Sequence, residues 1–328
     1  DAEAWNGLLG VTFDAFTRLR KGIFGTRSQT LPNTTGTTLP QENLNGEQTT
    51  GWDMSVSHHN NFGEFRYSVT GNLSYAFTKN LYRDRAKAGN SYENWYNNDS
   101  YRNQGIWFGL AENGQYQNWN EIYNDPLSTS YSQLPGDYKY VDWNEDGYIT
   151  DADRHIIGYS ADPQIYYGLT IELYWKGIDF NMLWQGAARH WVAYTEILGT
   201  SLWGGGNSPA YFYDRWHPVD PDANPYDPTT KWISGTYAYA GRQADVNSEH
   251  RILNAAYLRL KSVDLGYTLP SKWTQKAHIE SLRIFANIYN PLTFSGIKHV
   301  DPEHTSQNNG YIYPINTTYN LGIQLKFR

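Results

Sequence analysis

Two runs of alternating side chains, joined by a two-residue turn, constrain the fold of this chain more than any other feature. From Tyr167 to Trp175, apolar residues fall on every second position. After Lys176-Gly177 the alternation resumes from Ile178 to Trp184, where Leu183 breaks the polar row. A period of two indicates a strand with one apolar and one mixed or polar face. Each run is about ten residues long, the length that a tilted strand needs to cross a bilayer.

The same pattern predicts eight strands in the whole chain. The other six are expected near residues 9–19, 52–56, 65–78, 257–267, 282–289 and 319–327, with a further short strand near 106–116. The connections alternate between long and short, the long ones being 21–48, 79–164, 186–254 and 290–314. Outer-membrane barrels have short turns on one side and long loops on the other, whereas a soluble sandwich has no reason to alternate in this way.

Composition argues against membrane helices but does not exclude strands that lie in a membrane. No segment approaches the roughly 20 apolar residues of a membrane helix. Aromatic residues make up 16% of the chain, which suits a membrane interface or a carbohydrate-binding surface. The net charge of -7, without a basic run, argues against nucleic acid as a partner. Cysteine is absent, so disulfides, zinc–thiolate sites and cysteine nucleophiles are excluded.

Residues 142–153 have the spacing of a calcium-binding loop. Oxygen-bearing side chains occupy loop positions 1, 3, 5, 9 and 12, and Gly147 occupies position 6, where the turn needs a positive φ. Position 12 is Asp153 in place of the usual Glu, so a shorter side chain must reach the ion. The alternative is an Asp- and Asn-rich turn without metal. The loop predicts a structural calcium ion held by Asp142, Asn144, Asp146, Tyr148, Thr150 and Asp153.

Several stretches of the chain resemble one family of membrane proteins. They are 135–154 followed by Ile157-Gly158, then 255–270, 281–290 and the aromatic-ended final strand. With these stretches the chain resembles the C-terminal part of the SusC/RagA-type TonB-dependent transporters of the Bacteroidetes outer membrane. The last residue is Arg328, where such chains often end in an aromatic residue, and we expect Phe327 to serve as the assembly signal instead.

The resemblance implies an all-β fold, namely the C-terminal part of an antiparallel transmembrane β-barrel of about 22 strands with long extracellular loops. Residues 1–328 would form one segment of that barrel, with the calcium loop (142–153) inside the extracellular connection 79–164. The N-terminal plug and the earlier strands would lie outside this sequence, so we expect a fragment of a longer protein.

The resemblance also implies a function and partners. It implies TonB-dependent active import of glycans or oligopeptides across the outer membrane, beneath a SusD-like lipoprotein lid. Energy would come from TonB with ExbB and ExbD, and the barrel would contact outer-membrane lipid.

Two groups of residues are candidates for contact with the imported molecule. The first is aromatic and could stack on sugar rings, or else pack the loop or contact the lid protein, since aromatic residues dominate interfaces in general. The second is charged and faces the lumen, where it could guide solute or else contact the plug. The aromatic group is Trp203, Tyr211, Tyr213 and Trp216, and the charged group is Arg66, Glu172 and Asp179.

We expect no enzyme activity. The chain has no Gly-x-Ser-x-Gly elbow, phosphate loop or His-Glu-x-x-His motif. His58-His59 is expected at the short turn after the second strand, solvated and without a metal.

The main alternative is a secreted, calcium-stabilised carbohydrate-binding β-protein. A second alternative is a self-contained eight-stranded barrel. The three possibilities differ in whether the apolar rows are buried and in whether the sheet closes on itself.

Overall fold

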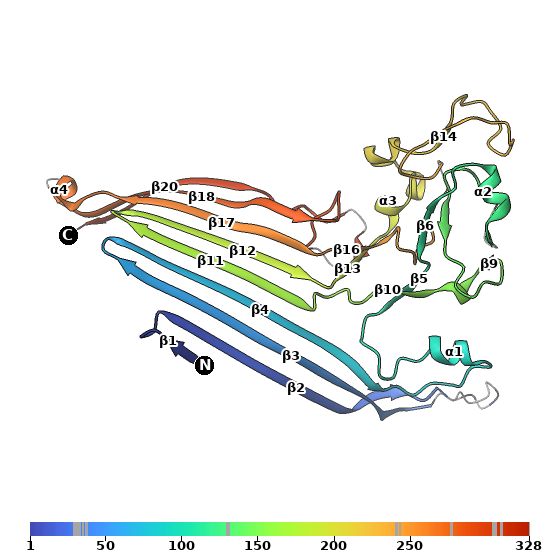
Figure 1. Cartoon of the computed structure of the whole chain (residues 1–328), viewed down its shortest axis with the longest axis horizontal. Coiled ribbons are helices and arrows are strands. Elements are labelled where there is room, and N and C mark those ends of the chain that lie inside the picture. Colours follow the sequence, from blue (N-terminus) through green and yellow to red (C-terminus); the bar gives the residue numbers. More distant parts are fainter. Residues whose placement is uncertain are drawn as a thin grey trace.

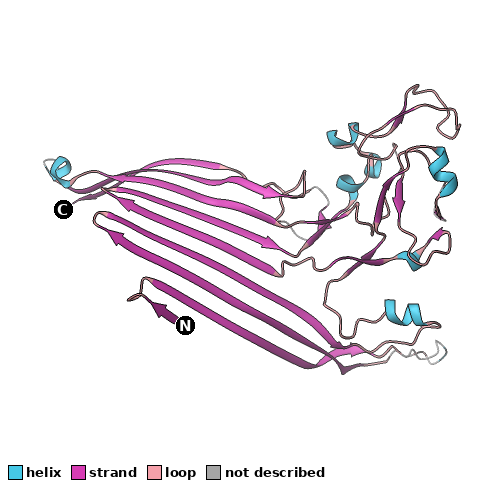
Figure 2. Cartoon of the chain, viewed as in Figure 1, coloured by secondary structure: helices cyan, strands magenta, loops and turns pink. Residues whose placement is uncertain are grey.

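One open antiparallel sheet forms most of the molecule (Figures 1 and 2). The computed structural model describes residues 1–28, 34, 36, 39–128, 132–239, 242, 244–275, 278–303, 307–308 and 311–327. Within these residues the sheet order is β1-β2-β3-β4-β11-β12-β17-β18-β20. The strands are β1 (Ala2–Ala4), β2 (Leu9–Thr26), β3 (Gln41–Phe62), β4 (Phe65–Tyr82), β11 (Ile165–Trp175), β12 (Ile178–Ala188), β17 (Tyr257–Thr268), β18 (Ile279–Ser295) and β20 (Thr318–Phe327).

Short elements occupy the connections between these strands. The short strands are β5 (Trp107–Gly109), β6 (Glu112–Gln115), β7 (Leu127–Ser128), β8 (Tyr138–Tyr140), β9 (Tyr148–Ile149), β10 (His155–Gly158), β13 (Trp191–Tyr194), β14 (His217–Pro218), β15 (Trp232–Ile233), β16 (Ile252–Asn254) and β19 (Gln307–Asn308). The helices are α1 (Ser91–Tyr96), α2 (Trp119–Asn124), α3 (Glu196–Gly199) and α4 (Ser271–Thr274), with single 3-10 turns η2 (Asp151–Asp153), η3 (Trp203–Gly205) and η4 (Ala210–Tyr213). None of the helices in the described part of the chain is long and apolar enough to span a membrane.

Strand register gathers the apolar residues of the eight long strands on one face, which we call the outer face. Leu265 on β17, for example, lies opposite Phe180 on β12 and Ala286 on β18. Leu321 on β20 continues the row and is 80% exposed. The accessible surface is 20,071 Å², against about 13,800 Å² for a compact globule of this mass. The apolar rows are therefore not buried in a second layer, as the secreted alternative would require.

The connections alternate in length as predicted. Gly63-Glu64 and Lys176-Gly177 link β3 to β4 and β11 to β12, and 269–278, which carries α4, links β17 to β18. Lys176 and Gly177 both have positive φ, 49° and 87°, which suits the twist of a two-residue hairpin. These short turns lie at one end of the sheet, the turn end, and the long connections lie at the other, the loop end (Figure 1).

The sheet does not close on itself within the described residues. β1 and β20 lie at opposite edges, and neither pairs with the other. The alternative of a self-contained eight-stranded barrel is therefore wrong.

The structure corrects the predicted strand ends. The loop expected at 21–48 is shorter, because β2 continues to Thr26 and β3 begins at Gln41. Ion pairs between these extensions, such as Arg27 with Glu42 at 2.8 Å, hold them together outside the apolar region.

Two smaller predictions were also wrong. His58-His59 lies inside β3, since the turn comes only at Gly63. The strand expected near 106–116 is two strands: β5 pairs with β10, and β6 pairs with β8.

The buried core of the described chain lies mostly outside the sheet, in a loop body that we define as residues 83–164, 189–256 and 296–303. One apolar cluster comprises Leu110, Tyr138, Tyr140, Ile149, Ala238 and Ala244. A second comprises Val192, Tyr194, Leu198, Ala255 and Ile297. The long connections thus fold on cores of their own at the loop end.

Candidate functional site

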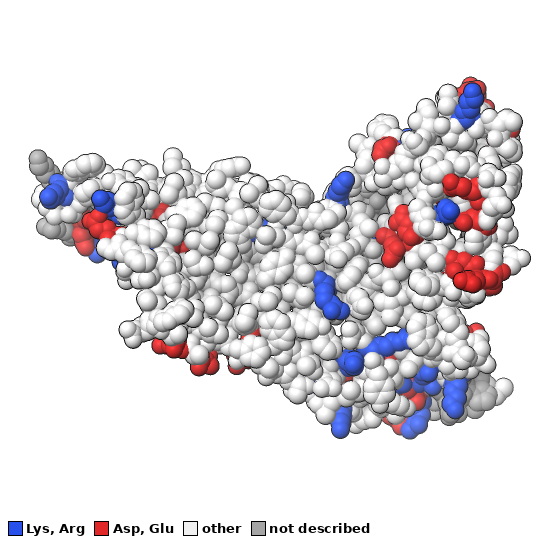
Figure 3. All heavy atoms as spheres, viewed as in Figure 1, with Lys and Arg blue, Asp and Glu red and all other residues white. Residues whose placement is uncertain are grey.

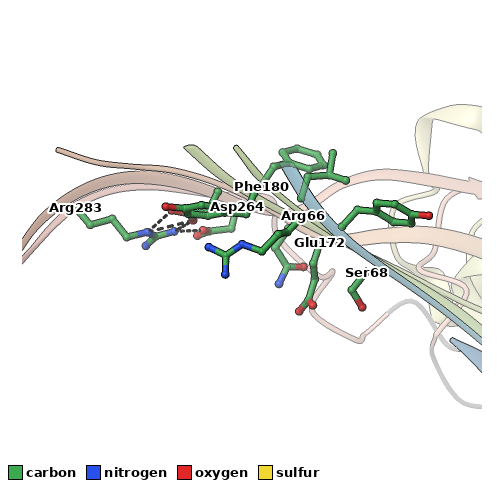
Figure 4. Close-up of a pocket in the computed structure, with 11 residues that line it drawn as sticks. Arg66, Ser68, Glu172, Phe180, Asp264 and Arg283 are labelled. Atoms are coloured by element: carbon green, nitrogen blue, oxygen red, sulfur yellow. Dashed lines mark hydrogen bonds and ion pairs between the residues drawn. The ribbon is translucent and has the colours of Figure 1, made fainter. Parts of the chain in front are cut away.

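The face opposite the apolar rows, which we call the inner face, carries a cluster of charges (Figure 4). Arg283 on β18 donates from Nε to Asp179 Oδ1 on β12 at 3.0 Å. Its Nη2 donates to Asp264 Oδ1 on β17 at 2.5 Å. One guanidinium therefore ties three strands together on this face.

A cavity of about 510 Å³ lies beside this cluster. Arg66, which also lines it, has its Cζ 4.3 Å from the centre of the Tyr174 ring. Glu172 lies on the same face, opposite Ser68 in register. Neither Arg66 nor Glu172 forms an ion pair with any residue that the structure describes. The structure thus brings the predicted lumen-facing group, Arg66, Glu172 and Asp179, to one cavity that can contact a polar partner.

Sequence reasoning missed Asp264, Arg283 and Arg259. Strand parity could have found the first two, because each is a neighbour of outer-face residues and so points to the inner face.

Arg259 anchors part of the loop body to the inner face of β17. Its side chain is 2% exposed, and its Nη2 donates to Asp301 Oδ2 at 2.5 Å. Lys261 adds a bond from Nζ to Glu303 Oε1 at 2.9 Å. Ion pairs therefore fix the segment that contains Asp301 and Glu303, which follows β18, against β17.

The predicted calcium loop folds into a compact turn. Gly147 has φ +84° and donates its N–H to Asp142 Oδ2 at 2.9 Å. Asp146 Oδ1 accepts from Tyr148 N at 2.8 Å. The side chain of Asp153 is buried, and its two oxygens accept from Trp143 N at 2.9 Å and Thr150 N at 2.7 Å. Asp153 thus completes the capping box of the 3-10 turn η2, whose N-cap is Thr150, as well as standing at loop position 12.

The loop leaves one oxygen that suits a cation. Asp142 Oδ1 is buried and has no hydrogen-bond partner. A buried carboxylate oxygen without a partner is costly, and a calcium ion would satisfy it. In the described part of the chain, no three His, Cys, Asp or Glu side chains gather into a metal cluster, so Asn144, Thr150 and the carbonyl of Tyr148 would have to complete the set.

An ion pair joins the calcium loop to a distant segment of the loop body. Arg154, directly after the loop, donates from Nη2 to Asp245 Oδ2 at 3.0 Å. Burial alone would raise the pKa of the Asp245 carboxyl, but the hydrogen bonds from Arg154 and from Asn247 N hold it below its usual range.

Two of the four predicted cargo-binding aromatics are packed inside the loop body. Trp216 is 4% exposed and lies against Gly136, where an added Cβ would come 2.2 Å from the indole Cγ. Tyr211 stacks on His299 with ring centres 4.0 Å apart. Trp216 is therefore not available to stack on a sugar in this structure.

The other two aromatics face outward. Tyr213 is 82% exposed and Trp203 is 47% exposed. Tyr213 lines a cavity of about 520 Å³ with Arg215 and residues 207–210. Trp203 is not among the residues that line it, so the four side chains do not form one binding surface.

A buried ion pair supports the fold around Trp216. Arg242 Nε donates to both carboxylate oxygens of Asp137, at 2.6 and 2.7 Å. Burial raises the pKa of the Asp137 carboxyl, and the hydrogen bond from Arg242 opposes the rise. Leu134 N donates to the same carboxylate at 2.8 Å. These contacts fix the segment whose Gly136 makes room for the indole.

Sequence comparison relates the chain to TonB-dependent receptors. It is 26% identical over 237 residues to TonB-dependent receptor P3 of Formosa agariphila, covering 68% of this chain and 22% of that protein. It is 26% identical over 220 residues to TonB-dependent receptor SusC of Bacteroides thetaiotaomicron, covering 67% of this chain and 20% of that protein. The chain thus spans about a fifth of the length of the curated relatives it matches. No protein-family model matches it.

Comparison of structures relates the fold to a known transporter. The RagAB peptide importer in its open-open state matches with a TM-score of 0.70 and 19% identity, over 99% of this chain and 33% of that one. A further structure of the RagAB peptide transporter matches with a TM-score of 0.68 and 19% identity, over 98% of this chain and 34% of that one. The chain therefore has the fold of part of such a transporter barrel.

These comparisons confirm the predicted resemblance to SusC- and RagA-type proteins. They also place the chain in the outer membrane of a Bacteroidetes-type bacterium. The sequence relatives are named as receptors and not as enzymes.

Proposed function

We propose that this chain is the C-terminal part of the barrel of a TonB-dependent transporter of about 22 strands that imports glycans or oligopeptides. The observation that carries the proposal is the open sheet itself, with one exposed apolar face and one charged face. Lipid would cover the outer face, and a lumen would lie along the inner face. Strands from the rest of the protein would pair with the two free edges.

The charged cluster on the inner face supports a plug as the internal partner. Arg66 and Glu172 border a cavity of about 510 Å³ and point away from lipid. A plug segment with polar side chains would complete their hydrogen bonds. TonB, with ExbB and ExbD, would supply the energy that moves the plug.

The loop end supports a lipoprotein lid of the SusD type as the external partner. The RagAB structures are named for two components. Here, Tyr213, Tyr123 and Trp143 are exposed large side chains on the loop body, and exposed aromatic residues are common anchors of protein interfaces.

The choice between glycan and oligopeptide cargo is supported by different observations. The similar RagAB protein is named a peptide importer. Paired and unpaired charges of both signs on the inner face suit an oligopeptide, whose own charges vary. The dispersal of the aromatic group weakens the case for a sugar-stacking surface, although Trp203 and Tyr213 stay exposed.

The transport proposal can be tested with the complete protein that contains this chain. Deletion of its gene should abolish growth on the imported oligopeptide or glycan, and the wild-type gene should restore it. A plug variant that cannot engage TonB should fail to restore growth although the protein is present in the outer membrane. Recovery of the protein in a water-soluble fraction, or restored uptake by that variant, would contradict the proposal.

The calcium site is a separate part of the proposal. Calcium, held by Asp142, Asn144, Asp146, Thr150 and Asp153 with the carbonyl of Tyr148, would pin a loop whose carboxylates otherwise repel. Its role would be structural.

The calcium site is tested by metal content and by proteolysis. Asp146→Ala should release the bound calcium and speed protease cleavage within 142–153, and the chelator EGTA should do the same to the wild-type protein. Asp162→Ala, an exposed carboxylate outside the loop, is the control. Unchanged calcium content and protease resistance in Asp146→Ala would rule the site out.

A further inference from the structure

The outer face carries an unequal distribution of charge. Successive side chains of a strand point to opposite faces, so the register tells which residues point outward. Between the turn end and the level of Lys21, the carboxylates of the eight described long strands lie on the inner face or at the turn end itself. Lys21 on β2 and Lys79 on β4 point outward, at the loop end. Arg189, directly after β12, joins them at the same end. All of these outward charges are positive.

Arg189 is held toward the outer face. Its Cζ lies 4.8 Å from the ring centre of Tyr159 and 5.8 Å from that of Tyr75, an outer-face residue of β4. Its backbone has φ 54°, a left-handed conformation that costs a non-glycine residue about 1 kcal/mol or more. The strained backbone and the two rings direct this guanidinium out of the loop body and onto the membrane side.

The cations have no acidic partner in the part of the chain that the structure describes. The ion pairs formed there include none with Lys21, Lys79 or Arg189. By contrast, Arg20, the inner-face neighbour of Lys21, is paired with Glu47 at 2.6 Å.

The outer face changes character toward this end in three steps. Phe13 and Trp52 stack in the apolar region. Next comes a polar layer, in which Gln48 Nε2 donates to Thr17 Oγ1 at 3.0 Å. Lys79 lies directly opposite Gln48 in register, at the level of the exposed Leu19 on β2, so it stands at the edge of the apolar region. Across a lipid interface, apolar side chains are expected first, then aromatic and hydroxyl-bearing side chains, and then cationic ones.

Strand geometry sets the spacing of the three cations. Lys79 is four residues beyond Tyr75 on one strand, about 13 Å along it. Lys21 lies two strands away from Lys79, about 10 Å across the sheet. The space-filling view shows Lys and Arg atoms where the strands meet the long connections, beside a sheet nearly free of charge on the face shown, with Asp and Glu atoms farther along on the loop side (Figure 3). The three side chains span a distance that suits several phosphate groups.

We propose that Lys21, Lys79 and Arg189 form a binding rim for the phosphate-bearing headgroups of outer-leaflet lipid. The proposal rests on the proposed function in taking the outer face to meet lipid and the loop end to be extracellular. Unpaired cations at the headgroup level attract anionic lipid, and each contributes a comparable share. The rim fixes the height of the sheet in the membrane and keeps a shell of anionic lipid around the loop end.

The test uses the complete transporter, purified in neutral detergent and titrated with lipid. Native mass spectrometry counts phosphatidylglycerol and, separately, zwitterionic phosphatidylcholine retained per molecule. The variant Lys21→Gln/Lys79→Gln/Arg189→Gln should lose phosphatidylglycerol affinity by about fivefold per charge removed, with phosphatidylcholine unchanged. Lys176→Gln, at the turn end and 3.6 Å from Glu64, is the matched control and should behave as wild type.

Two further arms keep the result decisive. The charge-preserving variant Lys21→Arg/Lys79→Arg/Arg189→Lys should retain phosphatidylglycerol, which separates charge from folding. Inorganic phosphate at the same concentration should not displace the lipid. Equal lipid retention by the Gln variant and wild type, equal loss in the Lys176→Gln control, or displacement by free phosphate would overturn the proposal. Loss of transport without a change in lipid count would instead concern the proposed function.

Discussion

A pair of adjacent substitutions on β12 tests which face of the sheet meets lipid. Met182 lies opposite Ile171 and Val263 on the outer face, whereas Asn181 lies opposite Glu172 and Asp264 on the inner face. Met182→Arg and Asn181→Arg therefore place the same charge at nearly the same depth on opposite faces.

The depth of Met182 sets the expected cost. β12 has 11 residues, so at about 3.3 Å per residue and a tilt of about 40° it rises roughly 28 Å. Met182, four residues after Ile178, lies about 10 Å from the turn end, close to the middle of an apolar band about 25 Å tall. An arginine facing lipid near the midplane costs about 2–4 kcal/mol, a fall of about 30- to 900-fold in the folding equilibrium constant.

Asn181→Arg should change stability far less. Its directly opposite neighbours, Glu172 and Asp264, are both carboxylates, so we expect a change within about 1 kcal/mol in either direction.

The measurement is urea-induced unfolding of the complete protein in lipid vesicles, followed by tryptophan fluorescence and by electrophoretic mobility without heating. Met182→Arg should lower the unfolding midpoint strongly, and Asn181→Arg should leave it near that of wild type. Equal losses in the two variants, or a larger loss in Asn181→Arg, would refute the assignment of the faces.

Two further predictions concern the loop body and the inner face. Gly136→Ala should destabilise the loop body by about 1–3 kcal/mol, because its Cβ would overlap Trp216. Limited proteolysis should cleave this variant faster than the control Gly114→Ala, where φ is also positive but no atom lies within 4 Å of the added Cβ. Equal cleavage rates in the two variants would contradict the packing. Arg283→Gln should leave two carboxylates facing each other and lower the free energy of unfolding, measured by urea titration, by about 1–2 kcal/mol, a modest value because the ion pairs are partly exposed. Adding Asp179→Asn should recover part of the loss, and an additive further loss would contradict the pairing.

All eight long strands could be predicted from the sequence, because each lies between two different environments. Where one face meets lipid and the other a polar interior, every residue must alternate, as from Leu169 to Met182. Beyond the membrane both faces are wet, so the alternation stops. The part of β3 that begins at Gln41 therefore shows no alternation of apolar and polar residues from which a strand could be predicted. It is held in place by cross-strand pairs such as Arg27 with Glu42, which only the structure reveals.

The candidate sites could be predicted only where the contacts are local. The hydrogen bonds within residues 142–153 join residues at most ten positions apart, so the spacing of Asp, Asn and Gly indicates this compact turn, and the calcium ion itself stays a prediction. Trp216 owes its burial to Gly136, eighty positions earlier, and Tyr211 stacks on the distant His299. An aromatic residue in a loop gives no sign of such partners, so sequence could not separate the packed members of the aromatic group from exposed Tyr213.

The bare edges of the sheet limit how such a wall can be built. Along β20 and along the β1–β2 side, peptide groups point outward with no neighbour in the described chain. In hydrocarbon each unsatisfied N–H or C=O costs several kcal/mol. A sheet with two unpaired edges would be unstable in the bilayer or would pair with a strand of another protein. A wall with these borders is therefore stable in a bilayer only where further strands pair with both of them.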